Sequence, residues 1–265
     1  MTIIFLGDVV GEPGRGALYR ALPELRAEFA ADAIVVNAEN AAGGRGITPR
    51  LAEEVLDRGA DAITQGDHAW DQAEMQTWLD SGAPAAARVL RPFNLQPGTP
   101  GRGSCIIPTP AGDLGILCLA GRTFMQGGAL NPFTTGYEEA LRLRAEGAQA
   151  LLVDMHAEAT SEKVAMGYRM DGTASLVAGT HTHVQTADDR VLPGGTAYIT
   201  DAGMCGSLNG VIGRDAESVL HGCITALPCK YPVGGWPAQV CGVCVRTDAQ
   251  GRALSVTRIA RIYEK

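Results

Sequence analysis

Short apolar runs alternate with amphipathic segments along most of the chain, and this alternation limits the fold more than any other feature. Apolar runs of this length are typical of buried strands. They occur at residues 3–6, 33–36, 61–64, 115–119, 151–153, 176–178, 197–199 and 240–245. Alternation of strand and helix predicts an α/β fold in which helices cover a parallel sheet.

The helices expected between the early strands carry start and stop signals. Thr48 and Pro49 are typical of a helix N-cap followed by proline at the first helical position, and Gly59 is typical of a helix end. Asp71 and Glu74 have the spacing of a capping box. We therefore expect one helix to begin after Thr48 and another after Asp71.

Length and composition predict one globular domain. The chain has 265 residues, of which 46% are hydrophobic and 19% are charged, which is ordinary for a folded domain. Residues 92–110 and 194–213 are rich in glycine, proline or asparagine and are expected to be loops. Neither has the character of a linker, so we expect a single domain over residues 1–265.

The formal net charge of −7 argues against duplex nucleic acid as the main partner, which would require a basic face. A small anionic substrate remains compatible with this charge, because a metal centre adds positive charge that residue counts omit. A homo-oligomer is also compatible, although the sequence does not specify one.

The cysteines and the N-terminus favour a cytoplasmic protein with no membrane segment. Seven cysteines, an odd number, are scattered along the chain. Cys241 and Cys244 have CxxC spacing, but they lie in a predicted strand and lack the second pair that a structural zinc site requires. The first apolar run ends at Asp8, too early for a signal peptide or a transmembrane helix.

Residues suited to metal binding follow five of the expected strands. Ligand sites in open α/β sheets form outside the carboxyl ends of the strands. The segments at these ends are Gly7-Asp8, Asn37-Ala38-Glu39-Asn40, Gln65-Gly66-Asp67-His68, Asp154-Met155-His156 and Gly179-Thr180-His181-Thr182-His183. They hold four of the five histidines, and the fifth, His221, lies in a predicted helix.

Each of these residues alone has an ordinary structural interpretation, such as a hydrogen-bonded histidine or a turn-capping aspartate. His181 and His183 differ, because alternate residues of an extended segment point the same way and can share a metal ion. Together the histidines and carboxylates predict a metal site. Imidazoles with carboxylates and no thiolate suit iron, manganese, zinc or nickel. The candidates are too many for one tetrahedral zinc and suit two ions that share a carboxylate.

At these residues the chain resembles the YmdB-like family of bacterial metallophosphoesterases, a branch of the calcineurin-like superfamily. The most specific segments are residues 156–163, HAEATSEK, and residues 179–188, GTHTHVQTAD. Further matches are residues 7–11, 37–42, 59–64, 68–71 and 195–201. The resemblance covers residues 2–215, and the last fifty residues match only loosely.

This resemblance implies a four-layer α/β/β/α sandwich with a dinuclear metal centre at one edge of the sheets. It implies iron, with manganese or zinc as alternatives. It also implies hydrolysis of 2′,3′-cyclic nucleotides, or 3′,5′-cyclic ones, by a metal-bridging hydroxide, with His68 as the general acid. By resemblance, one ion is held by Asp8, Glu39, Asn40 and His183, and the other by Glu39, Asp67, His156 and His181. No substrate-binding residue is assigned.

Asp67 departs from the family pattern, which has asparagine at this position. Aspartate remains a competent ligand, but its charge brings two divalent ions with Asp8, Glu39 and a hydroxide from +1 to zero. A neutral centre polarises a phosphoryl group less well. The enzyme is therefore expected either to be slower than its relatives or to prefer an Fe(III)/Fe(II) pair.

Two other functions fit parts of the sequence. A catalytically weakened metal- or nucleotide-binding regulator on the same fold would explain Asp67. An amidohydrolase-type enzyme also uses a His-x-His pair, but that pair usually follows the first barrel strand, and here it begins at His181. The main expectation is therefore a metal-dependent phosphodiesterase.

Overall fold

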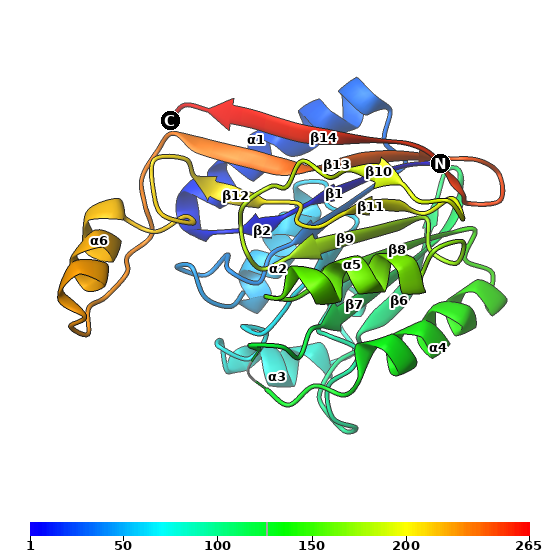
Figure 1. The fold of residues 1–265 in the computed structure, drawn as a ribbon, viewed down its shortest axis with the longest axis horizontal. Helices are drawn as coiled ribbons and strands as arrows, with labels where there is room; N and C mark the ends of the chain where they lie inside the picture. Colours follow the sequence, from blue (N-terminus) through cyan, green and yellow to red (C-terminus); the bar gives the residue numbers. More distant parts are fainter. Residues whose placement is uncertain (126) are drawn as a thin grey trace.

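The computed structural model describes residues 1–125 and 127–265. Two β-sheets lie face to face, and helices cover the outer face of each (Figure 1). The expected α/β class and the four-layer α/β/β/α arrangement are therefore both observed.

The first sheet is mixed. Its strands follow the order β2-β12-β13-β1-β3-β4-β5, and β14 pairs with β13. The bounds are β1 Thr2–Leu6, β2 Asp8–Val9, β3 Ala33–Asn37, β4 Ala62–Thr64, β5 Val89–Leu90, β12 Met204–Ser207, β13 Ala238–Thr247 and β14 Ala253–Tyr263. β1, β3, β4 and β5 are parallel, whereas β13 runs antiparallel to β1, β12 and β14. In this sheet the expected parallel arrangement is thus correct for β1, β3, β4 and β5, whereas β13 and β14 are antiparallel.

The second sheet has the order β10-β11-β9-β8-β7-β6. Its strands are β6 Ser104–Thr109, β7 Gly112–Ala120, β8 Ala150–His156, β9 Leu176–Thr180, β10 Arg190–Val191 and β11 Ala197–Ile199. β7, β8, β9 and β11 are parallel to one another, so their carboxyl ends share one edge, whereas β6 and β10 pair antiparallel at the two sides of the sheet.

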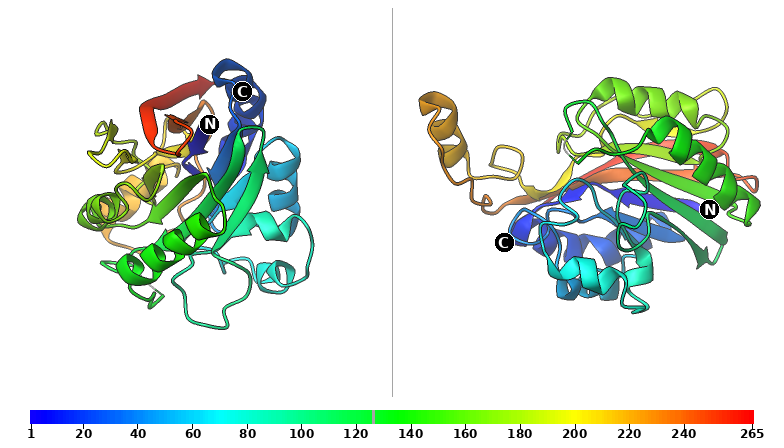
Figure 2. Two further views of the ribbon diagram at one scale, coloured as in Figure 1. Left: turned by 90° about the vertical axis from the view of Figure 1, so that its right-hand side faces the viewer. Right: turned by 90° about the horizontal axis from the view of Figure 1, so that it is seen from below.

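The outer face of the first sheet is covered by helices α1 (Gly11–Phe29), α2 (Pro49–Asp57) and α3 (Glu74–Leu79) and the 3₁₀ turn η1 (Ala86–Arg88). Helices α4 (Pro132–Ala145) and α5 (Thr160–Arg169) cover the second. Helix α6 (Ala216–Thr225) extends away from both sheets, as the orange segment in Figure 2 shows.

The core consists of three buried layers that follow from strand periodicity. Along β1, Ile4 and Leu6 pack under α1, whereas Ile3 and Phe5 point between the sheets. Successive side chains of a strand face opposite ways, so a central strand of a four-layer protein must be apolar throughout. This explains why the apolar runs predicted the strands well.

Local signals were correct for one helix and wrong for another. The Thr48 hydroxyl accepts from the backbone N–H of Leu51, and Pro49 begins α2, as expected. The capping box at Asp71 is wrong, because α3 is capped at Ala73 and the Asp71 carboxylate binds Arg45 and His68 instead.

The two predicted loops also contain strands. Strand β6 lies within residues 92–110 and β12 within residues 194–213, whereas β11, in the same stretch, was expected from the apolar run 197–199. Pro108 is tolerated in β6 because this strand is at the sheet edge, where one row of backbone N–H groups needs no partner. Among the described residues, no helix has both the length and the apolar character needed to cross a bilayer.

Candidate metal centre

The predicted ligand residues lie at the carboxyl ends of β1, β3, β4, β8 and β9. Strands β1, β3 and β4 are parallel neighbours in one sheet, and β8 and β9 are parallel neighbours in the other. The two sheets therefore deliver their strand ends to a common edge. Asp8, Glu39, Asn40 and His156 are buried there, whereas Asp67, His181 and His183 are partly exposed.

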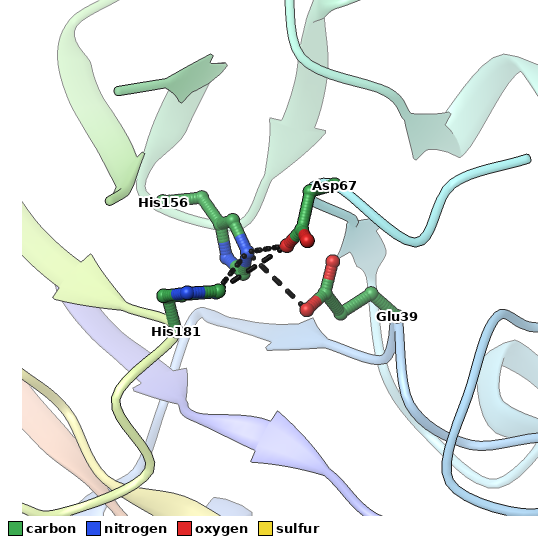
Figure 3. A group of neighbouring side chains, drawn as sticks. All are labelled: Glu39, Asp67, His156 and His181. Atoms are coloured by element: carbon green, nitrogen blue, oxygen red, sulfur yellow. Dashed lines mark hydrogen bonds and ion pairs between the residues drawn. The ribbon is translucent and has the colours of Figure 1, made fainter. Parts of the chain in front are cut away.

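Four of these side chains form one compact group, drawn in Figure 3. One ligand atom from each of Glu39, Asp67, His156 and His181 lies within 4.8 Å of the others. His156 Nε2 is 2.9 Å from Asp67 Oδ1 and 3.2 Å from Glu39 Oε1. His181 Nδ1 is 3.3 Å from Asp67 Oδ1.

The remaining three predicted ligands form a second group beside the first. His183 Nε2 is 3.7 Å from Asp8 Oδ1 and 3.4 Å from the side-chain amide of Asn40. The same amide donates to Glu39 Oε1 at 3.1 Å. Glu39 therefore lies between the two groups.

His156, His181 and His183 each direct one ring nitrogen into these two groups, and the other ring nitrogen contacts a partner outside them. A nitrogen that donates its proton outward leaves the inner one with a lone pair, which is the state that binds a metal. The outer partners are Thr180 Oγ1 for His156 at 2.9 Å, Glu158 Oε2 for His181 at 3.2 Å and the carbonyl of Ile212 for His183 at 3.0 Å.

The segment that carries His181 and His183 is not extended, contrary to the sequence-based reasoning. It follows the end of β9, and His181 and His183 have φ angles of 96° and 65°. Residues other than glycine rarely adopt a positive φ, so the surrounding contacts must hold this turn in place. The buried carboxylate of Asp201 accepts from the backbone N–H of Thr182 at 3.2 Å and from its hydroxyl at 2.6 Å.

Two observations support metal binding by the residues present. Asp8 Oδ1 is buried and has no hydrogen-bond partner among the described residues. A Cβ atom at Gly66 would lie 2.2 Å from His156 Nε2 and 2.4 Å from Glu39 Oε2, so only glycine leaves this side of the groups open. The donor set, imidazoles and carboxylates, suits first-row transition metals.

The charges around the first group also favour a cation. Burial acts to raise the pKa of Asp67, but hydrogen bonds to His156 and His181 hold it well below its usual range. Burial acts to lower the pKa of His156, yet Glu39, Asp67 and Asp8 raise it well above the ordinary value. The carboxylates thus demand a nearby positive charge, which bound metal ions would supply.

His68 lies beside the two groups. Its ring is 24% exposed, and its Nδ1 lies 3.1 Å from Asp71 Oδ2, which also accepts from Arg45 Nε at 2.7 Å. It lines a pocket of about 330 Å³. The other residues around this pocket are Glu39, Asn40, Glu158, His181, Thr182, His183, Ile212 and Arg214.

Sequence reasoning missed the residues that support the histidines from behind. Asp154 lies in β8, and its carboxylate accepts from Asn37, Thr64 and Thr180. Burial raises its pKa to about 6, partly offset by His156 and these hydrogen bonds. A charged residue directly after the apolar run 151–153, inside a strand that continues to His156, was the available signal, because buried carboxylates require partners.

The chain matches the family model described as "YmdB-like protein" over residues 4–259. It is 41% identical to a "2′,3′-cyclic-nucleotide 2′-phosphodiesterase" of Bacillus subtilis, over 98% of this chain and 96% of that protein. It is 34% identical to a "putative phosphatase/phosphodiesterase" of Mycoplasma pneumoniae, over 100% of this chain and 94% of that protein.

Solved structures agree with this result. A phosphatase from Mycoplasma pneumoniae has a TM-score of 0.91 at 32% identity, covering 100% of this chain and 94% of that one. A hypothetical protein from Thermus thermophilus has a TM-score of 0.90 at 35% identity, covering 100% of both chains. A 5′-nucleotidase precursor from the same organism, at 15% identity and a TM-score of 0.57, shares the fold over 54% of its length.

These matches confirm the expected resemblance to the YmdB-like family and the four-layer sandwich fold. The chain belongs to the YmdB-like protein family.

Proposed function

We propose that this chain is a metal-dependent phosphodiesterase that hydrolyses cyclic nucleotides, with the 2′,3′-cyclic class preferred over the 3′,5′-cyclic class. The observation that carries the proposal is the convergence of three inward-facing imidazoles with Glu39 and Asp67 at one sheet edge. The name and 41% identity of the Bacillus subtilis relative support the substrate class.

Asp8, Asn40 and His183 would hold one metal ion, and Asp67, His156 and His181 the other. Glu39 would contact both, because it lies between the two groups. Iron suits these ligands, with manganese or zinc as alternatives. When bound, the two ions would supply positive charge for the phosphoryl oxygens and lower the pKa of an attacking water.

His68 would donate a proton to the departing ribose oxygen. Asp71 holds Nδ1 of this ring, so the other ring nitrogen is free to serve the leaving group. The guanidinium of Arg214 lines the same pocket, where it would oppose the negative charge of the substrate. Backbone carbonyls of Gly44 and Tyr231 hold this guanidinium in place.

The test is hydrolysis of 2′,3′-cyclic AMP and 3′,5′-cyclic AMP by protein loaded with manganese or iron, with products separated by chromatography. His156→Ala should lose at least a hundredfold in turnover, whereas His221→Ala, in the exposed part of α6, should retain it. Chelation should abolish activity and added metal should restore it. If the protein binds two metal ions but hydrolyses neither nucleotide, the proposal is wrong and a metal- or nucleotide-binding regulatory protein on the same fold replaces it.

All seven cysteines are free thiols, which supports a cytoplasmic location for this enzyme. The substrate would be a small anionic phosphate ester rather than duplex nucleic acid, because the net charge of −7 does not provide the basic face that duplex nucleic acid requires.

A further inference from the structure

One buried carboxylate connects the two sheets behind the candidate metal centre. Asp154 in β8 is fully buried and accepts hydrogen bonds from Asn37 Nδ2 at 3.0 Å, Thr64 Oγ1 at 2.6 Å and Thr180 Oγ1 at 2.7 Å. Asn37 and Thr64 end β3 and β4 in the first sheet, whereas Thr180 ends β9 in the second. The carboxylate therefore bonds to three strand ends besides its own.

Each of these four strands runs directly into a predicted ligand. Movement of a strand end would move its ligand by a similar amount, and metal centres tolerate little displacement. The pairs of bonded residue and following ligand are Asn37 and Glu39, Thr64 and Asp67, Asp154 and His156, and Thr180 and His181.

The hydrogen-bond chain from Asp154 also determines which nitrogen of His156 carries the proton. A carboxylate has no proton to give, so the Thr180 hydroxyl donates to Asp154 Oδ1. That hydroxyl has only one proton, so its oxygen must accept from His156 Nδ1, 2.9 Å away. In a neutral His156 ring, Nε2 then keeps its lone pair, and this is the atom that faces Glu39 and Asp67.

We propose that Asp154 is a positioning residue that acts through the Thr180 hydroxyl to present His156 Nε2 as a metal ligand. This inference rests on the metal centre of the proposed function. Asp154 itself would contact neither metal nor substrate, since its carboxylate reaches the His156 ring through the Thr180 hydroxyl.

The surroundings predict how Asp154→Asn would act. Asn37 Nδ2 can only donate, because Asn37 Oδ1 accepts from the backbone N–H of Glu39 at 3.2 Å. The oxygen of the new amide must therefore face Asn37, and its NH₂ group must face Thr180. The Thr180 hydroxyl would then accept from that amide and donate to His156 Nδ1, which places the proton of a neutral imidazole on Nε2 and blocks coordination.

The experiment measures zinc affinity by chelator competition in wild type, Asp154→Asn, Thr180→Val and Thr180→Ser. Thr180→Val removes the hydroxyl at nearly constant shape, and Thr180→Ser keeps it. We expect the dissociation constant for zinc to be about 10–100-fold higher in Asp154→Asn and Thr180→Val, and near that of wild type in Thr180→Ser. The zinc-loaded wild type should also show a slowly exchanging His156 Nδ1 proton by NMR, absent from Thr180→Val.

Thr196→Val is the matched control for lost stability. Thr196 is a buried threonine at a distant position, and its hydroxyl donates to the carbonyl of Ala174 at 2.6 Å. This variant should lose thermal stability and keep wild-type zinc affinity.

The outcomes separate the two proposals. If wild type fails to bind two zinc ions, the metal centre itself is wrong. If wild type binds two ions and Thr180→Val keeps that affinity, or Thr196→Val weakens it equally, the positioning role is wrong and the metal centre stands. Should Asp154→Asn not fold, the comparison of Thr180→Val with Thr180→Ser decides.

Discussion

Lys163 and Asp201 form a fully buried ion pair that supports the turn between the two histidines of the predicted site. Lys163 Nζ lies 2.7 Å from Asp201 Oδ2, and neither side chain is exposed. Asp201 also accepts from both the backbone and the hydroxyl of Thr182 and from the backbone N–H of Gly203. Lys163→Met keeps an unbranched side chain one atom shorter and removes its charge.

Breaking a buried pair by removing one partner costs roughly 3–5 kcal/mol, because the other charge remains buried without compensation. Asp201 keeps the donors of Thr182 and Gly203, so we expect the lower end of that range, about 3 kcal/mol. For a chain of this size, this loss corresponds to a fall in Tm of roughly 6–12 °C.

Differential scanning calorimetry of chelator-treated protein measures this effect without interference from metal binding. Lys230→Met is the control, because this lysine is exposed and its loss should change stability by less than about 0.5 kcal/mol. A Lys163→Met protein as stable as Lys230→Met would refute the reasoning.

Three further predictions concern the predicted site itself. Gly66→Ala places a methyl group 2.2 Å from His156 Nε2 and should weaken metal binding about 10–100-fold. The control is Gly235→Ala, whose methyl group meets open space and should leave metal binding unchanged. Equal metal affinities of the two variants in a titration would contradict this. Asp67→Asn should raise turnover severalfold with manganese or shift the iron oxidation state, and no change in either would remove the charge argument. His68→Ala should keep both metals and lose about 10²–10⁴-fold in turnover, and a loss of bound metal instead would make His68 a ligand.

The strands and the predicted ligands could be found from the sequence because both leave local signals. A strand buried on both faces is largely apolar, as in β1 and the first four residues of β8, and a polar residue directly after the apolar run stands out. The shared carboxyl edge of parallel strands then brings these residues together, and this rule needs no knowledge of contacts.

The rest could not be predicted because it depends on long-range pairing. In β14 only Ala253, Ile259 and Tyr263 are buried, so the strand has no clear period, and it is stabilised by pairing with β13 along its length. The role of Asp154 likewise depends on Asn37, which lies 117 residues away in the other sheet. The position of Asp154 in a buried strand, directly after an apolar run, signals a partner without identifying it.

The capping box at Asp71 shows the same limit for short motifs. Its spacing fits a helix start, yet the Asp71 carboxylate binds Arg45 and His68 instead of the helix N-terminus. A cap contributes about 1 kcal/mol, which nearby charged partners can outweigh.

Anomalous diffraction at the iron and manganese absorption edges, from crystals of the protein as purified, tests the dinuclear centre most directly. Two ions per chain are expected, one among Asp8, Asn40 and His183 and the other among Asp67, His156 and His181, with Glu39 in contact with both. A single ion, no ion, or ions bound elsewhere on the chain would contradict it.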